Sequence, residues 1–320
     1  KHNNASLVRV NPRLRKANLE QSIRVTLPNG FSSHYRIYRK YQTDYGNTVI
    51  AAKGNIASER IIIAMSSDGM SAGMIKGGGN TYSIEPTGDI SVLKLDEGFG
   101  KDIDDIVYPD QTSTLRSELE SESFSLADPE NTDVAEINVL VYYDTLHNNP
   151  MLAIDTSFAI ANQAYIDSGI HIVLNPIQLE PLELSPEESE FATISQMYSR
   201  SGAFSDLDEI MDLSGADIAT TFIAGGGRYV CGIARLSLYD DSTHPNEAIN
   251  VTSCQYGETF AHEIGHNLGA IHDIQQSPYG GGVFPYARGF RNDGLFGTVM
   301  SYGYPEVGLF SSPELFCATD

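Results

Sequence analysis

Residues 262–273 read HEIGHNLGAIHD, a stretch in which three histidines stand at fixed spacings. His262 and His266 are four residues apart, so on a helix their side chains lie only about 40° apart around the axis and reach the same point. Gly269 can adopt the positive φ that ends a helix and turns the chain back, which would let His272 approach that point too. The stretch therefore predicts a short helix and a turn that gather three imidazoles around a metal ion.

Three neutral imidazoles leave a fourth position open, which is typical of a catalytic zinc site rather than a structural one. Glu263 follows the first histidine, where its carboxylate can meet the water that zinc activates without binding the metal itself. We expect zinc to lower the pKa of that water and to polarise a peptide carbonyl, while Glu263 takes the proton. Hydrolysis of protein or peptide substrates is the expected outcome.

The motif resembles the long zinc signature of the metzincin metallopeptidases, and TVMSY at residues 298–302 is similar to their Met-turn. The resemblance implies that Met300 forms a hydrophobic floor under the imidazoles without binding zinc. Tyr302 resembles the tyrosine that some metzincins use as an extra zinc ligand or as a donor to the oxyanion. The alternative for Tyr302 is a tyrosine that merely packs in the turn.

Three further features resemble the reprolysin (adamalysin-like) branch and the bacterial peptidyl-Asp metallopeptidases: Asp273, GAD at 215–217 and VCGIA at 230–234. This resemblance covers residues 134–320. It implies a secreted enzyme in which the strand around 230–236 pairs with an extended substrate. A preference for aspartate would need a cationic pocket, for which Arg288 and Arg291 are candidates. Asp273 would either orient a group near the metal or cap the exit of the helix.

Residues 1–109 are expected to form a β-rich domain, because β-forming runs at 23–27, 34–38 and 60–64 alternate with turn residues. Residues 69–75 and 82–86 resemble the propeptide of reprolysin-type zymogens, which implies an intramolecular inhibitor. Residues 1–230 contain no cysteine, so a cysteine cannot block the zinc from here. We expect the block to come from a carboxylate, either Asp68 or Asp89, or from an extended segment that fills the cleft. The alternatives are an unrelated β-domain and an N-terminal domain that recognises substrate instead of inhibiting.

Residues 110–133 are acidic and rich in serine, a composition typical of a linker that proteases cut during maturation. The catalytic domain would then span residues 134–320. Its start predicts a strand at 135–143, a helix at 150–168 and a strand at 170–174, followed by a helix at 195–213 and a strand at 216–223. Little regular structure is expected beyond residue 280. The predicted fold class is α/β (α+β), with a twisted mixed sheet and an active-site helix.

The net charge of −22 argues against a nucleic-acid partner, and no run of apolar residues is long enough to span a membrane. Residues 1–60 carry 11 basic and three acidic groups, a balance of +8, whereas residues 134–320 carry five arginines, no lysine and 24 acids, a balance of −19. This asymmetry favours docking of the N-terminal part on the catalytic part. Cys231, Cys254 and Cys317 allow one disulfide in three pairings.

One rival interpretation is a proteolytically inactive binding module on a metzincin scaffold. The presence of Glu263, the expected general base, argues against it.

Overall fold

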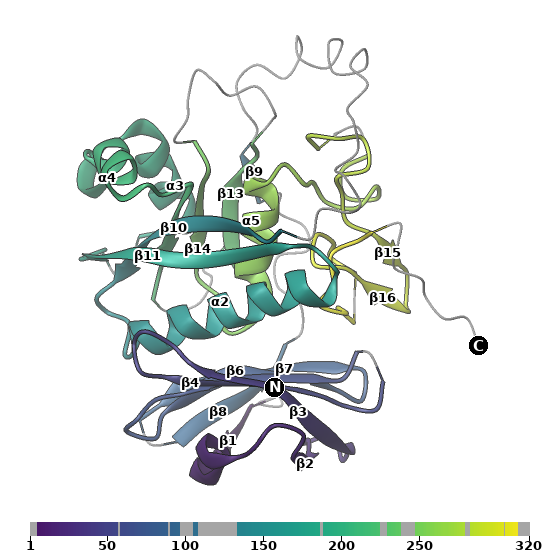
Figure 1. The fold of residues 1–320 in the computed structure, drawn as a ribbon. Coiled ribbons are helices and arrows are strands. Elements are labelled where there is room, and N and C mark those ends of the chain that lie inside the picture. The colour runs from purple at the N-terminus through teal and green to yellow at the C-terminus, as the bar shows by residue number, and fades with distance from the viewer. Residues whose placement is uncertain are drawn as a thin grey trace.

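The computed structural model describes residues 5–56, 58–88, 90–96, 105–107, 133–185, 188–224, 229–237, 247–278, 282–303 and 305–312. Figure 1 shows two sheets, one above and one below the long helix α2. In the described part of the chain, no helix is long and apolar enough to cross a membrane.

The N-terminal part of the described chain forms an antiparallel sheet in the order β1-β8-β7-β6-β5-β4-β3-β2. Its strands are β1 (Ala5–Val8), β2 (Ser22–Thr26), β3 (Ser32–Gln42), β4 (Thr48–Lys53), β5 (Arg60–Met65), β6 (Ser71–Gly77), β7 (Asn80–Thr87) and β8 (Ile90–Leu95). The three predicted β-runs lie in β2, β3 and β5, so the prediction of a β-rich segment is confirmed. We call residues 5–96 the N-terminal sheet.

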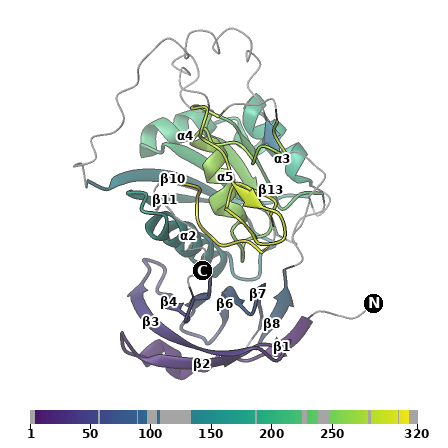
Figure 2. The same cartoon turned by 90° about the vertical axis from the view of Figure 1, so that its right-hand side faces the viewer.

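The N-terminal sheet has two apolar faces, because the central strands are buried on both sides. One face, with Ile37, Ile61 and Ile84, packs around the short helix η1 (Pro12–Lys16). The opposite face, with Val49 and Ile62, packs against helix α2. Figure 2 shows the sheet curling beneath that helix.

The second sheet has the order β11-β10-β12-β14-β13-β9. Its strands are β9 (Ile106–Val107), β10 (Ala135–Asp144), β11 (Ile172–Leu182), β12 (Ile218–Phe222), β13 (Gly232–Arg235) and β14 (Ile249–Thr252). All neighbouring pairs are parallel except β13 and β14. The mixed sheet and the βαβ start from β10 through α2 (Pro150–Asp167) to β11 are as predicted.

Helix α2 lies between the two sheets and is apolar on both sides. Leu152 and Ile160 contact the N-terminal sheet, whereas Ile154 and Phe158 join the core beneath the second sheet. That core extends to Phe260 at the start of helix α5 (Thr259–Asn267). The packing of α2 therefore connects the N-terminal sheet to the helix that carries the histidines.

The predicted helix at 195–213 is instead three short pieces, α3 (Glu190–Ser199), η2 (Gly202–Phe204) and α4 (Leu207–Ser214). The break follows from the backbone, because Arg200 and Gly202 have φ values of 50° and 62°. A helix cannot continue through two left-handed residues. Beyond residue 282, the described regular elements are the two-residue strands β15 (Arg291–Asn292) and β16 (Phe296–Gly297), as expected.

One of the predicted domain limits differs from the structure, and another lies where the structure describes almost no residues. Residues 106–107 were placed with the N-terminal domain, yet as β9 they extend the second sheet. The predicted linker at 110–133 lies outside the described residues, apart from Asp133.

Candidate metal centre

Helix α5 carries the first two histidines on one face and ends where the motif predicts. Gly269 has a φ of 86°, and its N–H donates to the carbonyl of His266, which closes the last turn. A Cβ at Gly269 would lie only 2.6 Å from Val283, so space as well as conformation requires glycine there. The chain turns back, and His272 joins His262 and His266 as predicted.

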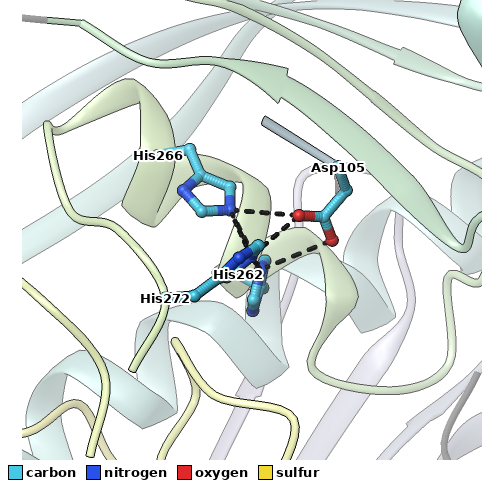
Figure 3. Close-up of side chains that lie close together, drawn as sticks. All are labelled: Asp105, His262, His266 and His272. Carbon is cyan, nitrogen blue, oxygen red and sulfur yellow. Dashed lines mark hydrogen bonds and ion pairs between the residues drawn. The ribbon is translucent and has the colours of Figure 1, made fainter. Parts of the chain in front are cut away.

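The three Nε2 atoms face one another at separations of 3.0, 3.1 and 3.2 Å (Figure 3). Two of the rings are held in place by a hydrogen bond of their other nitrogen: Nδ1 of His262 donates to the carbonyl of Val299, and Nδ1 of His266 donates to that of Ala270. Zinc–nitrogen bonds of about 2.0–2.1 Å in a tetrahedral site place the nitrogens about 3.3–3.4 Å apart. The three imidazoles therefore fit one zinc ion.

A fourth side chain, Asp105, completes the group (Figure 3). Its Oδ1 lies 2.8 Å from Nε2 of His272 and 3.5 Å from Nε2 of His266, and its Oδ2 lies 3.6 Å from Nε2 of His262. A carboxylate oxygen is a normal zinc ligand. Asp105 thus stands at the position that a catalytic site would keep open for water and substrate.

The backbone next to Asp105 occupies the edge of the second sheet. Strand β9 runs parallel to β13, with hydrogen bonds from the N–H of Ala234 to the carbonyl of Asp105 and from that of Leu236 to the carbonyl of Val107. The side chain of Ile106 is buried against Leu236 and Ile271. Residues 105–107 therefore cover the strand edge on which the sequence led us to expect substrate.

Electrostatics at the cluster favour an ionised Asp105 and a neutral His266. Burial works against ionisation of Asp105, but the nearby His262 and the hydrogen bonds of the three histidines together outweigh it and hold the pKa of this carboxyl well below its usual range. Burial lowers the pKa of His266 to about 4, so this ring is neutral and available as a ligand at neutral pH. Burial also opposes protonation of His262, yet Asp105 raises the pKa of that ring.

Glu263 lies beside the cluster with a buried carboxylate. Neither carboxylate oxygen has a hydrogen-bond partner within the described residues. Burial, and then the charge of Asp105, raise the pKa of Glu263 well above its ordinary value. The carboxylate lies against the backbone of β13, since a Cβ on Gly232 would come within 2.3 Å of Oε1. This is where a proton acceptor for water at the metal would be needed.

Met300 and Tyr302 lie on the chain that passes beneath the histidines. A Cβ on Gly265 would come within 2.2 Å of Sδ of Met300, so the methionine packs directly under the middle of α5. The ring of Tyr302 lies 4.6 Å from that of His272 and is stacked on that of His262 at 5.8 Å. Met300 thus has the place expected of the floor, and Tyr302 adjoins two of the three imidazoles.

Asp273 follows the last histidine and is buried. Its Oδ1 accepts from the N–H of Gln275, and the carboxylate is ion-paired with Arg291 at 3.4 Å. Arg291 also pairs with Asp293 at 3.3 Å. Asp273 therefore caps the turn after the motif and holds Arg291, one of the two candidate pocket residues. Arg288 is partly buried, and its backbone bridges to that of Ile271.

The carboxylates proposed from sequence as blocking groups are not in the cluster. Asp68 lies in the exposed turn between β5 and β6, where it accepts a hydrogen bond from Ser66, which lowers its pKa. Asp89 is outside the described residues. Asp105 was missed because it belongs to an acidic run, 102–105, that has the composition of a linker. The one local signal was the apolar pair Ile106 and Val107 directly after it.

Of the three pairings open to the cysteines, the structure contains Cys231–Cys254. The bond ties the start of β13 to the segment that leads into α5, next to the cluster. Cys317 is outside the described residues.

Residues 151–273 match the model of the metallopeptidase family M12B, reprolysin-like. Among curated proteins, the chain is similar to the peptidyl-Asp metalloendopeptidase of Stenotrophomonas maltophilia strain R551-3, with 24% identity over 312 residues that cover 91% of this chain and 71% of that one. The enzyme of the same name from Pseudomonas aeruginosa is 27% identical over 180 residues, 48% of this chain but only 30% of the relative. The match thus spans 30% of the length of the Pseudomonas enzyme and 71% of that of the Stenotrophomonas enzyme.

Among solved structures, metalloproteinase-II from Bacteroides fragilis has a similar fold, with a TM-score of 0.53 and 14% identity over 94% of this chain and 90% of that one. The family match, the curated relatives and the buried group of three histidines and one aspartate together support a metzincin-like zinc metalloendopeptidase.

Proposed function

We propose that this chain is the latent form of a secreted zinc metalloendopeptidase, in which the N-terminal part inhibits the catalytic part that follows it. The observation that carries the proposal is the placement of Asp105 at the fourth position of a three-histidine zinc site. The histidines come from α5 and the turn after it, whereas Asp105 directly precedes β9. The inhibitor and the site thus belong to different parts of the same chain.

His262, His266 and His272 would hold the zinc. When bound, zinc supplies Lewis-acid polarisation of the scissile carbonyl and activation of water. The carboxylate of Glu263 takes a proton from the attacking water and passes it to the leaving amine. The phenol of Tyr302 donates a hydrogen bond to the developing oxyanion.

The edge of β13 would bind an extended peptide once residues 105–107 have left it. The relatives named peptidyl-Asp metalloendopeptidases motivate a preference for aspartate, which Arg288 and Arg291 would recognise. In the latent chain, Arg291 is paired with Asp273 and Asp293. Recognition by Arg291 would therefore require an aspartate to compete with these two carboxylates.

The test uses the full chain with Asp105→Ala, which frees the fourth position of the zinc site. The substrate is a short aspartate-containing peptide. In that background, Glu263→Gln should keep one zinc per chain while activity falls by several orders of magnitude. Glu209→Gln, an exposed position on α4, is the matched control and should leave activity unchanged. Full activity in the Glu263→Gln variant, or chains that bind no zinc, would overturn the proposal.

A further inference from the structure

Two buried cationic side chains of the N-terminal sheet form ion pairs with the catalytic part. The ammonium of Lys76, on β6, lies 2.6 Å from Oε2 of Glu258, the N-cap residue of α5. The same ammonium donates to the carbonyl of Glu306 at 2.9 Å. Both side chains of the Lys76–Glu258 pair are at most 4% exposed. One cation of the N-terminal sheet is therefore part of the support of the metal-binding helix.

The second cation is Arg60 on β5. Its Nη1 lies 3.1 Å from Oδ2 of Asp167, at the end of α2, and 3.0 Å from the carbonyl of Gly308. Both side chains of this pair are 5% exposed, and Lys53 adds a half-exposed contact to the other oxygen of Asp167 at 2.9 Å. Removal of one partner from a buried pair leaves an uncompensated charge, which is strongly unfavourable.

Polar and apolar contacts fill the space between these ion pairs and the far end of α2. The carboxylate of Asp155 accepts hydrogen bonds from the hydroxyl of Thr43 and the amide of Asn47, each at 2.6 Å. Between these polar groups lies an apolar cluster of nine side chains, six from the N-terminal sheet and three from α2: Val49, Ala51, Ile62, Ala64, Ala72, Met74, Leu152, Ala159 and Ile160. The contact between the N-terminal sheet and α2 is thus apolar and buried like the interior of one protein, as in obligate interfaces.

The blocking group lies on the N-terminal side of the predicted cleavage region. Asp105 and β9 precede residues 110–133, so a cut in that region leaves Asp105 covalently attached to the N-terminal sheet. Nothing in such a cut removes the contacts of Lys76, Arg60 or the apolar cluster.

We propose that the face made by α2 and the first turn of α5 keeps the N-terminal sheet bound as a separate chain after the cut. The cut product is then an inhibited two-chain complex, and activation is a second event that removes the N-terminal sheet. The inference rests on the proposed function for its inhibitory consequence, but the persistence of the complex does not depend on peptidase activity.

The experiment inserts a recognition sequence for a site-specific protease after Arg116 in the full chain. After complete cutting, we expect both fragments to elute together from a size-exclusion column at sub-micromolar concentration. Peptidase activity should stay within about twofold of that of the uncut chain. Separate elution of the fragments, with activity that appears as fast as the cut, would overturn the proposal.

Two variants identify what holds the fragments together. Lys76→Met leaves Glu258 buried without its cation, so the cut fragments should dissociate at least about tenfold faster. Lys94→Met removes an ion pair with Glu85 inside the N-terminal sheet and serves as the matched control, with no change expected. Equal dissociation rates of the two variants would exclude the Lys76–Glu258 contact as the anchor.

Asp105→Ala in the cut complex keeps the test decisive if Lys76→Met does not fold. Its fragments should still elute together, whereas a short peptide should now be hydrolysed. Fragments that separate would refute the docking proposal, because the retention would then depend on the metal. Fragments that stay together without activity would instead count against the proposed function, so the two failures are distinguishable.

Discussion

Oδ1 of Asp105 lies 2.8 Å from Nε2 of His272, although Asp105 directly precedes β9 and His272 belongs to the histidine motif much later in the chain. This contact ties the segment that we propose to be inhibitory to the metal centre through a side chain, while the backbone of residues 105–107 is held by β13. The proposed block is therefore double: a carboxylate fills the fourth position, and a short strand fills the edge next to it.

The first prediction concerns this carboxylate. Asp105→Ala in the intact chain should raise hydrolysis of a short peptide at least about tenfold, because the fourth zinc position opens while the three histidines stay. The measurement is the initial rate before any cleavage, verified on a denaturing gel. Asp68→Ala, in the exposed β5–β6 turn, should change nothing. Latency that survives Asp105→Ala would count against Asp105 as the blocking group and against the proposed function.

The second prediction concerns Tyr302. In the Asp105→Ala background, Tyr302→Phe should lower kcat roughly 10–10³-fold with little change in KM, since a bond to the oxyanion strengthens only in the transition state. The ring and its contacts with His262 and His272 are kept by phenylalanine. Unchanged kinetics would leave Tyr302 with a packing role only.

The third prediction concerns Gly232, whose missing side chain makes room for Glu263. Gly232→Ala should push the carboxylate out of place and cost roughly 10–100-fold in kcat, with zinc content unchanged. Gly257→Ala is the matched control, because the nearest atom to its added Cβ, on Asp96, lies 3.8 Å away. If Gly232→Ala and Gly257→Ala have equal kcat, Glu263 does not depend on this gap.

The fourth prediction concerns pH and Glu306. Burial and the neighbouring Glu258, to which it is hydrogen-bonded, raise the pKa of Glu306 well above its ordinary value of 4.5. The folded state therefore favours the protonated form, and its contribution is complete below pH 4.5 and is lost as the pH rises towards the folded pKa. Glu306→Gln imitates that form and should raise Tm at pH 7 but not at pH 4. A lower Tm of the variant at pH 7 would contradict the shift.

Local features of the site could be predicted from sequence because they depend on helix geometry. The spacing of His262 and His266, the stop at Gly269 and the return to His272 are all set within 11 residues, and the structure places them as expected. The position of Met300 followed from resemblance and also agrees. Asp105 could not be predicted, because its place depends on the path of a chain segment across a different sheet.

The charge asymmetry indicated that the two parts attract each other but not where. Lys53, Arg60 and Lys76 contact acidic residues of the catalytic part, and Lys76 lies outside the basic stretch at 1–60. Arg36, from the same stretch, instead pairs with Glu20 inside the N-terminal sheet, where both side chains are exposed. Net charge determines whether the two parts attract each other at long range. The specific contacts between them depend on which strands of the N-terminal sheet face α2.

Because helix α2 is apolar on both sides, it buries both of them only when the N-terminal sheet and the second sheet are present. Chains fold from the N-terminus as the ribosome releases them, so the N-terminal sheet is complete when residues 150–167 emerge. The sheet then acts as the template on which α2 settles before the rest of the catalytic part is made. A gene truncated to residues 134–320 is therefore expected to give aggregated product, and co-expression of residues 1–133 to restore soluble protein.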